Sequence, residues 1–114
     1  MLRHVVAKRR YDLRASSGEH LRPVTISFGR PVKREEHVYR CFFRIDGLPW
    51  GGLLSADGTD GVSALLLAMV RAGTHLYHSQ EFKNGLITLH GSPNLGLPAI
   101  NGDVVPDPML TLTV

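Results

Sequence analysis

Histidines are the first residues to consider for chemistry, because six of them occur in a chain of 114 residues. None stands in a Cys-x-x-Cys, His-Glu-x-x-His or comparable ligand frame. Only His75 and His78, spaced i and i+3, can share one face of a helix, and no third ligand accompanies them in the sequence. We therefore expect surface histidines and no metal site.

Two glycine-rich stretches have the composition of ligand loops but not the spacing. Asp57–Gly61 lacks the bidentate acid that closes a calcium loop, so Asp60 or Thr59 is expected to cap a helix instead. Gly47–Gly52 is followed by neither Lys-Ser/Thr nor a helix start, which favours a hairpin over a phosphate-binding loop. Serine, histidine and aspartate occur without a nucleophile-elbow pattern. We predict no catalytic residue, no cofactor and no enzymatic activity.

Basic residues are concentrated in the N-terminal part of the chain. Residues 1–44 hold eleven Lys or Arg against four acidic residues, a net charge of +7, whereas residues 45–114 hold two against six, a net charge of −4. A basic strand face with interleaved aromatic residues is one way to bind nucleic acid, and the other interpretation is a solvated strand that is charged for solubility. The candidate nucleic-acid-binding residues are Lys8, Arg9, Arg10 and Arg14.

Three residues are candidates for binding a protein partner. Trp50 lies between a proline and a glycine, where a tryptophan either reaches a partner or plugs the core. Leu67 and Arg71 belong to a helix side that is otherwise rich in alanine and poor in charge for a surface exposed to water. We expect this side to make a second contact, either with the C-terminal segment or with another chain.

These candidates depend on one helix, which is predicted over residues 60–78. Its apolar residues recur at i, i+3, i+4 and i+7, and this stripe is predicted to pack on a sheet. Replacing Leu66 by Ala should then cost about 2–5 kcal/mol of stability. The predicted buried face consists of Val62, Leu65, Leu66, Met69 and Val70.

Alternation of apolar and polar residues predicts the strands. They are expected at residues 5–15, 24–28, 38–45, 51–56 and 86–90. Lys33–Glu36 is predicted to be a charged hairpin tip, and the residues expected beneath the helix are Ile26, Phe28, Cys41, Phe43 and Ile45. The predicted fold class is α+β, an antiparallel sheet of four to five strands with one helix packed on one face.

The C-terminal part of the chain allows two arrangements. Residues 91–108 are rich in proline and glycine and are predicted to be irregular, whereas residues 109–114 alternate like an edge strand of this sheet or of a neighbouring molecule. With the charge-poor helix side, this segment predicts a two-fold homodimer. The alternative is that residues 95–114 fold back over the helix and leave a monomer.

Length and composition indicate one globular domain spanning residues 1–114, because 43% of the residues are hydrophobic and 20% are charged. The longest apolar run, Ala64–Val70, is too short to span a bilayer. Lys8–Arg10 precedes any apolar secretory segment, so we expect a cytoplasmic protein that does not enter a membrane. Cys41, the single cysteine, is expected to be a buried apolar residue.

Four segments of the chain, Cys41–Leu48, Ala56–Leu65, Leu76–Tyr77 and Gly96–Pro98, resemble a family of small uncharacterised bacterial domains. The resemblance covers residues 24–98, and its motifs are structural. Several such proteins are similar to immunity proteins, which neutralise a cognate toxin by binding it. The resemblance implies no functional residue, and the basic N-terminal strand departs from a simple acidic inhibitor of a nuclease.

Two functions are therefore predicted. The first is a non-enzymatic protein-binding module, in its narrower form an immunity-type inhibitor of a bacterial toxin, with Trp50, Leu67 and Arg71 as contacts. The second is a nucleic-acid-binding module that uses the basic N-terminal strands. A salt titration separates them, because phosphate contacts lose affinity steeply as salt rises.

Overall fold

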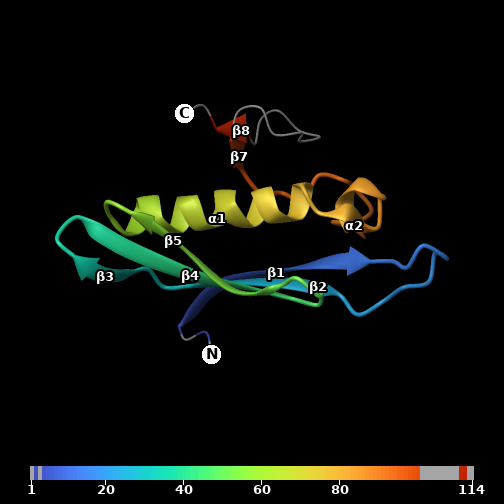
Figure 1. Ribbon diagram of the computed structural model, residues 1–114, viewed down its shortest axis with the longest axis horizontal. Helices are drawn as coiled ribbons and strands as arrows, with labels where there is room; N and C mark the ends of the chain where they lie inside the picture. Colours follow the sequence, from blue (N-terminus) through green and yellow to red (C-terminus); the bar gives the residue numbers. More distant parts are fainter. Residues whose placement is uncertain (1, 3, 101–110, 113–114) are drawn as a thin grey trace.

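The computed structural model describes residue 2, residues 4–100 and residues 111–112, with only the backbone described for residues 99, 100, 111 and 112. Figure 1 shows α1 lying across one face of the main sheet, with β7 and β8 on the far side of the helix. The elements in chain order are β1 (Val5–Leu13), β2 (Val24–Gly29), β3 (Val32–Glu35), β4 (Val38–Asp46), β5 (Gly52–Gly58), α1 (Gly61–Tyr77), α2 (Gln80–Lys83), β6 (Ile87–Thr88), β7 (Ala99–Ile100) and β8 (Thr111–Leu112).

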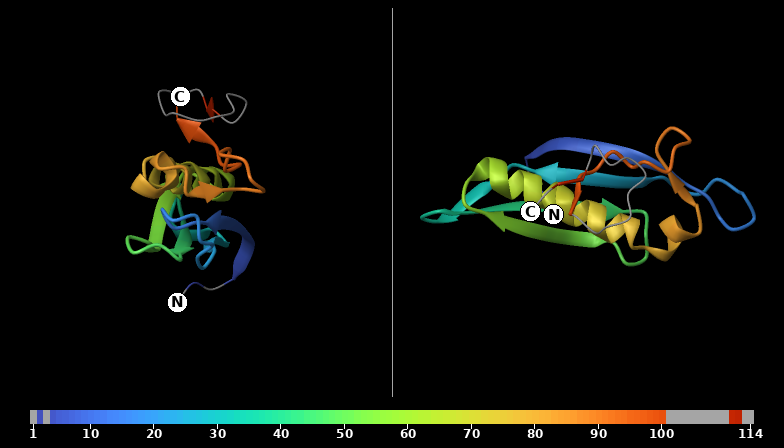
Figure 2. Two further views of the ribbon diagram at one scale, coloured as in Figure 1. Left: turned by 90° about the vertical axis from the view of Figure 1, so that its right-hand side faces the viewer. Right: turned by 90° about the horizontal axis from the view of Figure 1, so that it is seen from above.

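The main sheet is antiparallel and has six strands. β2 and β3 pair with successive parts of the same side of β4, and β5 pairs with its other side. One outer edge of the sheet is therefore β5; the other side is formed by β1 with β6, and by the short strand β3 beside the first residues of β4 (Figure 2). The antiparallel sheet with one main helix confirms the predicted architecture.

The predicted number of strands, four to five, was too low. Val32–Glu35 is a strand, although Lys33–Glu36 was predicted to be a hairpin tip. Pro31 lies between β2 and β3 and has no backbone N–H to give to a ladder, so the pairing along β4 is interrupted there and resumes after it. The expected fifth strand over residues 86–90 is present in a shorter form as β6.

The helix begins where the sequence predicted. The Asp60 carboxylate accepts a hydrogen bond of 2.8 Å from the backbone N–H of Ser63, and this bond lowers the pKa of Asp60. Gly58 precedes the cap, and a Cβ atom at this position would lie 2.4 Å from the backbone nitrogen of Ala64. The chain can therefore turn from β5 directly into α1 only because residue 58 has no side chain.

The predicted buried face of the helix was partly wrong, because Val70 is buried and Leu65 and Met69 pack against the core, but the other two predicted residues are exposed. Val62 is 79% exposed and Leu66 is 41% exposed, whereas Ala64, Ala68 and Ala72 are completely buried. These alanines repeat at i and i+4 and share the core with the predicted sheet residues, which are buried as expected. The small side chains bring the helix axis close to β4 and β5, so the face chosen by hydrophobicity is not the face that meets the sheet.

The opposite side of α1 is covered by the chain after β6. Gly73 lies nine residues after Ala64, which is half a revolution around the helix. A Cβ atom at Gly73 would lie 2.8 Å from the carbonyl oxygen of Pro98 and 3.3 Å from Cβ of Leu97. Leu95 and Leu97 are buried at this contact. The helix is thus apolar on two sides because it is packed between the sheet and residues 95–98.

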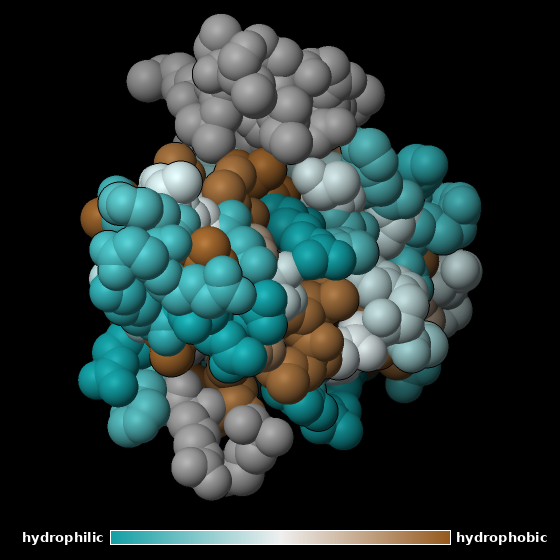
Figure 3. Space-filling model, turned by 60° about the vertical axis from the view of Figure 1, so that its left-hand side comes forward, coloured by the Kyte–Doolittle hydropathy of each residue, from teal (hydrophilic) through white to brown (hydrophobic). Residues whose placement is uncertain are grey.

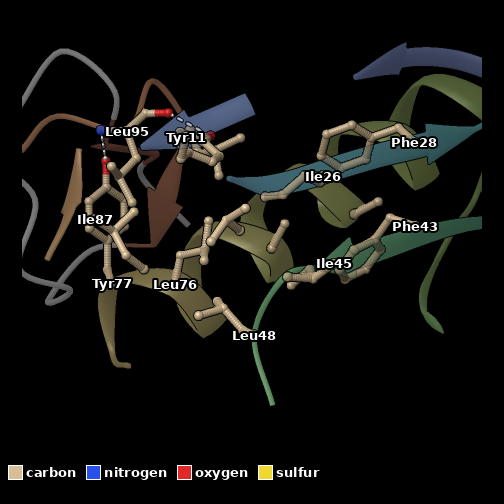
Figure 4. Packing of buried hydrophobic residues seen from close by; sticks show 14 of the residues in the cluster. Tyr11, Ile26, Phe28, Phe43, Ile45, Leu48, Leu76, Tyr77, Ile87 and Leu95 are labelled. Atoms are coloured by element: carbon tan, nitrogen blue, oxygen red, sulfur yellow. Dashed lines mark hydrogen bonds between the residues drawn. The ribbon is translucent and has the colours of Figure 1, made fainter. Parts of the chain in front are cut away.

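Two tyrosines hold this segment in place (Figure 4). The hydroxyl of Tyr11, on β1, donates a 2.8 Å hydrogen bond to the carbonyl oxygen of Leu95. The backbone N–H of Leu95 donates a 2.9 Å bond to the hydroxyl of Tyr77, on α1. Both backbone polar groups of the buried Leu95, its N–H and its carbonyl oxygen, are satisfied in this way, which is required where no strand or helix pairs them. The segment therefore closes the core at the β1 side of the molecule.

The C-terminal strand predicted over residues 109–114 lies mostly outside the described residues. Its described part, β8, pairs in parallel with β7 in a separate two-stranded sheet and not with the main sheet. None of the helices in the described chain combines the length and the hydropathy needed to cross a bilayer.

Candidate functional site

A stripe of side chains runs along α1 above the free edge of β5. Leu67, Arg71 and His75 are spaced at i, i+4 and i+8, so they lie one above another on a single side of the helix. Leu67 is 43% exposed, and Arg71 is also exposed. The guanidinium of Arg71 donates a hydrogen bond to the backbone carbonyl oxygen of Ser55, which connects the stripe to the edge strand.

Trp50 extends this stripe at the end of the helix. It lies in the turn before β5, and its ring stacks on that of His75 with centroids 6.3 Å apart and an interplanar angle of 23°. Its indole N–H donates a 3.1 Å hydrogen bond to Oε1 of Glu81 on α2. With 39% of its surface exposed, Trp50 is neither a core plug nor a free side chain. It is a fixed aromatic surface whose polar edge is already bonded.

A surface cavity of about 640 Å³ opens beside Trp50 and is lined otherwise by the end of α1 and the start of α2, from Thr74 to Glu81. Among the described residues, Glu81 is the only carboxylate that lines the cavity, and none of the described lining residues is a lysine or arginine. The pKa of His75 is lowered, first by burial and then by the nearby charge of Arg71. The lowered pKa favours the uncharged form of His75 at neutral pH. Among the described residues that line the cavity, Glu81 is the one that brings a negative charge.

The edge of β5 presents backbone groups that no strand pairs. β5 is paired with β4 over seven consecutive residues, from Gly52 to Gly58, without a bulge. Because the carbonyl oxygen of Ser55 reaches Arg71, the backbone groups of Ser55 point away from β4. Backbone direction alternates along an antiparallel strand, so Leu53 and Asp57 point the same way. The described chain places no strand on this side of β5.

We call this surface the β5 rim. Its apolar part includes Leu53, which is 46% exposed and lies on the face of the sheet opposite the helix. The exposed apolar residues of α1 outside the rim, Val62 and Leu66, lie nearer its N-terminus. On the face of the molecule drawn in Figure 3, apolar patches are separated by polar surface. The β5 rim consists of Trp50, Leu53, Ser55, Leu67 and Arg71.

All three residues predicted to bind a partner, Trp50, Leu67 and Arg71, belong to the β5 rim. The argument that selected Leu67 and Arg71 was partly wrong, because the alanines grouped with them are core residues. Sequence reasoning did not find Ser55 or Glu81. The i, i+4 spacing of Arg71 and His75 indicates that they share one side of the helix. The hydrogen bond between Trp50 and Glu81 joins positions 31 residues apart, so no local sequence pattern indicates it.

The four predicted nucleic-acid-binding residues are not brought together. Lys8 and Arg10 alternate onto the face of the sheet that α1 leaves uncovered. Arg9 points to the other face and donates hydrogen bonds to the carbonyl oxygens of Leu95 (3.1 Å) and Gly96 (2.7 Å). Arg14 lies beyond the end of β1, in an isolated bridge with His20.

The uncovered face of the sheet is also less basic than its lysines and arginines indicate. Arg40 donates bonds of 2.8 and 3.1 Å to Asp57, and Arg44 donates a bond of 2.8 Å to Asp46. The pairing lowers the pKa of Asp57 and raises that of Arg40. Two of the cations on this face are therefore already neutralised by acids of the same strand or the next one.

Groups for redox or metal chemistry do not form a site in the described chain. Cys41 is completely buried, as predicted; its Sγ lies 3.3 Å from the carbonyl oxygen of Gly29, and burial raises the pKa of the thiol. A buried thiol of raised pKa is a poor nucleophile. Among the described residues, no group of three histidine, cysteine, aspartate or glutamate side chains is placed to hold a metal ion.

Comparison with known proteins identifies the family. The family model "Domain of unknown function (DUF6968)" matches residues 7–99. This range includes both helices and all of the main sheet except the first two residues of β1. The chain belongs to this family. None of the curated proteins and none of the solved structures matches the chain. DUF6968 agrees with the expected small uncharacterised domain, while the comparisons lend no support to a bacterial origin or to a similarity with immunity proteins.

Proposed function

We propose that this protein is a non-enzymatic protein-binding module, and that an extended segment of a partner protein adds as a strand to the edge of β5. One observation carries the proposal. The outward carbonyl oxygen of Ser55 is satisfied by an arginine side chain and not by another strand, on an edge that is regular over seven residues. A long, regular edge of this kind is a template for pairing with another chain.

The side chains around the edge suit this mode of binding. In strand addition, main-chain hydrogen bonds supply affinity, and alternate side chains supply specificity on the two faces of the new strand. Leu53 lies on one face of the edge, and Leu67 lies on the other, above the strand. Trp50 stands at the end of the edge as a fixed aromatic anchor, the type of residue that most often dominates an interface.

Charge on the rim favours a different protein over a second copy as the partner. Two copies paired antiparallel about Ser55 would place both Arg71 side chains beside the two-fold axis, on the same face of the joined sheet. Like charges facing each other are destabilising. A partner segment with an acidic residue at this point would instead release Arg71 from Ser55 to form an ion pair. An immunity-type inhibitor, with a toxin domain as partner, is one narrower form of this proposal.

Nucleic-acid binding is the weaker proposal. Of the four predicted residues, Lys8 and Arg10 are the two that share the uncovered face of the sheet, because Arg9 is bonded to backbone and Arg14 lies beyond the end of β1. The arginines of β4 on that face are paired with acids. Retention on single-stranded DNA that falls steeply with salt, and that is lost in a Lys8→Gln, Arg10→Gln double variant, would favour it over strand addition.

Selection of short random peptides displayed on phage tests the proposal without a known partner. A selected peptide should bind Ser55→Pro at least about tenfold more weakly than the wild type, because the substitution removes an outward N–H of the edge. Proline is tolerated on an edge strand at such a position, so the fold should persist. Ser55→Thr is the matched control and should bind like the wild type.

A second measurement keeps the test independent of the variant. When a selected peptide binds the wild-type protein, the backbone amides of Leu53, Ser55 and Asp57 should become protected from hydrogen exchange. Selected peptides that bind Ser55→Pro as tightly as the wild type, and that leave these amides unprotected, would show that the edge of β5 is not the binding site.

A further inference from the structure

The cavity beside Trp50 lies at the end of the β5 rim and has a chemistry of its own. We propose that it binds an ammonium or guanidinium group, and that the group is a lysine or arginine side chain of the partner segment. That the cation belongs to a partner segment rests on the proposed function. That the cavity binds an ammonium or guanidinium group does not. No lysine or arginine is among the described residues that line the cavity, which leaves Glu81 to pair with an incoming positive charge.

The carboxylate of Glu81 is the first reason. Its Oε1 accepts the indole N–H of Trp50 at 3.1 Å, which fixes the orientation of the carboxylate beside the ring. Within the described part of the chain it has no ion-pair partner, although the whole sequence carries a net charge of +3. A carboxylate that is held in place but not neutralised can pair with a cation at little cost in side-chain ordering.

The ring of Trp50 is the second reason. One face of the indole stacks on His75, while 39% of the residue is exposed. A cation within about 6 Å of a tryptophan face is attracted by the ring quadrupole, and tryptophan gives the strongest attraction of the aromatic side chains. The ring and the carboxylate of Glu81 are joined by a hydrogen bond, so one ligand group can contact both.

Neighbouring groups do not compete for the site. His75, behind the ring, favours its uncharged form at neutral pH because burial and the charge of Arg71 lower its pKa. The guanidinium of Arg71 is itself bonded to the carbonyl oxygen of Ser55 and does not line the cavity. His78 also lines the cavity, and among the described lining residues Glu81 is the one that brings a negative charge to attract a cation.

The position of the cavity also agrees with its use by a bound segment. β5 starts at Gly52, two residues after Trp50. A strand added antiparallel to β5 leaves the edge at Gly52 and continues toward Trp50. A basic residue that follows the paired part of the segment would therefore bring its side chain to the cavity, which would give the module a preference for one sequence class.

The single tryptophan of the chain is a reporter for this site. Capped amino acids are titrated at low salt, and the indole N–H resonance of Trp50 is followed by NMR. N-acetyl-lysine methylamide and N-acetyl-arginine methylamide should shift the resonance with saturation, whereas the neutral N-acetyl-norleucine methylamide should not. Glu81→Gln keeps an acceptor for the indole N–H but removes the charge, and it should weaken binding by about fivefold or more. Lys83→Gln, on the same helix but outside the cavity, is the matched control and should not weaken binding.

Two outcomes would overturn the inference. One is the absence of a saturable shift with either cationic probe in the wild-type protein. The other is an equal shift with norleucine, which would make the cavity an apolar pocket and not a cation site. A capped amino acid forms no strand, so these results are independent of the peptide experiment. Strand addition at β5 can be rejected while the cation site is supported, and the reverse is also possible.

Discussion

The β1 edge and the β5 edge of the main sheet are protected in different ways. At the β1 edge, β6 pairs with Asp12 and Leu13, and residues 95–96 lie against the strand, held by Tyr11 and Arg9. Before that point, the register of β1 is shifted between Val5 and Ala7. Bulges and covering segments are the usual ways in which proteins close an edge.

At the β5 edge there is neither a bulge nor a covering strand in the described chain. Arg71 alone reaches the edge, through the Ser55 carbonyl. Both edges thus use an arginine that donates to backbone carbonyl oxygens, but Arg9 ties down a covering segment, whereas Arg71 occupies a place that a strand could take. A segment of the chain thus covers the β1 edge, whereas the β5 edge stays open in the described chain, as the proposed strand addition requires.

The largest expected effect is the difference in stability between leucines at the two edges. Leu95→Ala should lower the free energy of unfolding by about 2–5 kcal/mol, because Leu95 is completely buried and its loss leaves a cavity. Leu67→Ala is the matched control and should cost less than about 1 kcal/mol, since Leu67 is 43% exposed. Chemical denaturation measures both. Equal losses would mean that the β5 rim is also part of the core.

Hydrogen exchange compares the edges without any substitution. In the free protein, the outward amides of Leu53 and Ser55 should exchange at least about a hundredfold faster than the inward amides of Leu54 and Ala56, which is about 3 kcal/mol in opening free energy. NMR-detected exchange at neutral pH measures the four rates. Uniform protection along β5 would show that another segment covers the edge in solution.

The pH dependence of stability tests the covered edge. Burial raises the pKa of Tyr11 to about 12, from an ordinary value of 10.0, and Arg9 acts in the opposite direction. Because the folded pKa lies above the unfolded one, the stabilisation is complete below pH 10 and is lost as the pH rises through about 12. The loss should be of order 2 kcal/mol.

Urea unfolding between pH 9 and pH 12 detects this loss, and Tyr11→Phe should reduce it. At neutral pH the same substitution should cost only about 1 kcal/mol, since the Leu95 carbonyl keeps its bond from Arg9. An undiminished loss in the variant would assign the pH dependence to other groups.

The smallest expected effect concerns self-association through the open edge. The wild type should scatter light as one chain of 12.6 kDa at micromolar concentration, and Arg71→Ser should strengthen pairing of two copies by roughly fivefold, because it removes a like-charge contact. A wild-type mass of twice that value, returned to one chain by Leu67→Arg, would identify a second copy as the occupant of the rim.

Local sequence patterns were sufficient to predict most of the elements. The alternation in β4, the cap at Asp60 and the length of α1 are set by residues close in sequence, so periodicity and capping chemistry reveal them. The antiparallel order of β1, β2, β4 and β5 follows from short connections. The buried sheet residues, including Cys41, follow from the same alternation.

Only the tertiary structure decided which side of α1 meets the sheet. The helix is packed on both sides, so hydrophobicity does not show which of its two apolar stripes faces the sheet. That was decided by how closely each stripe lets the helix approach the strands. The alanine stripe allows a close approach to β4 and β5, while Gly73 admits Pro98 on the other side. Those contacts join residues far apart in the chain, and no local pattern records them.

The same reason explains the candidate site. Trp50, Leu67 and Arg71 were recognisable one by one, but their grouping on a single rim follows from where α1 lies on the sheet. Ser55 and Glu81 matter only through their partners, the guanidinium of Arg71 and the indole of Trp50. The sequence by itself determined the elements and the polarity of their residues, because these depend on neighbouring residues. The packing of one helix determined which residues form the exposed β5 rim.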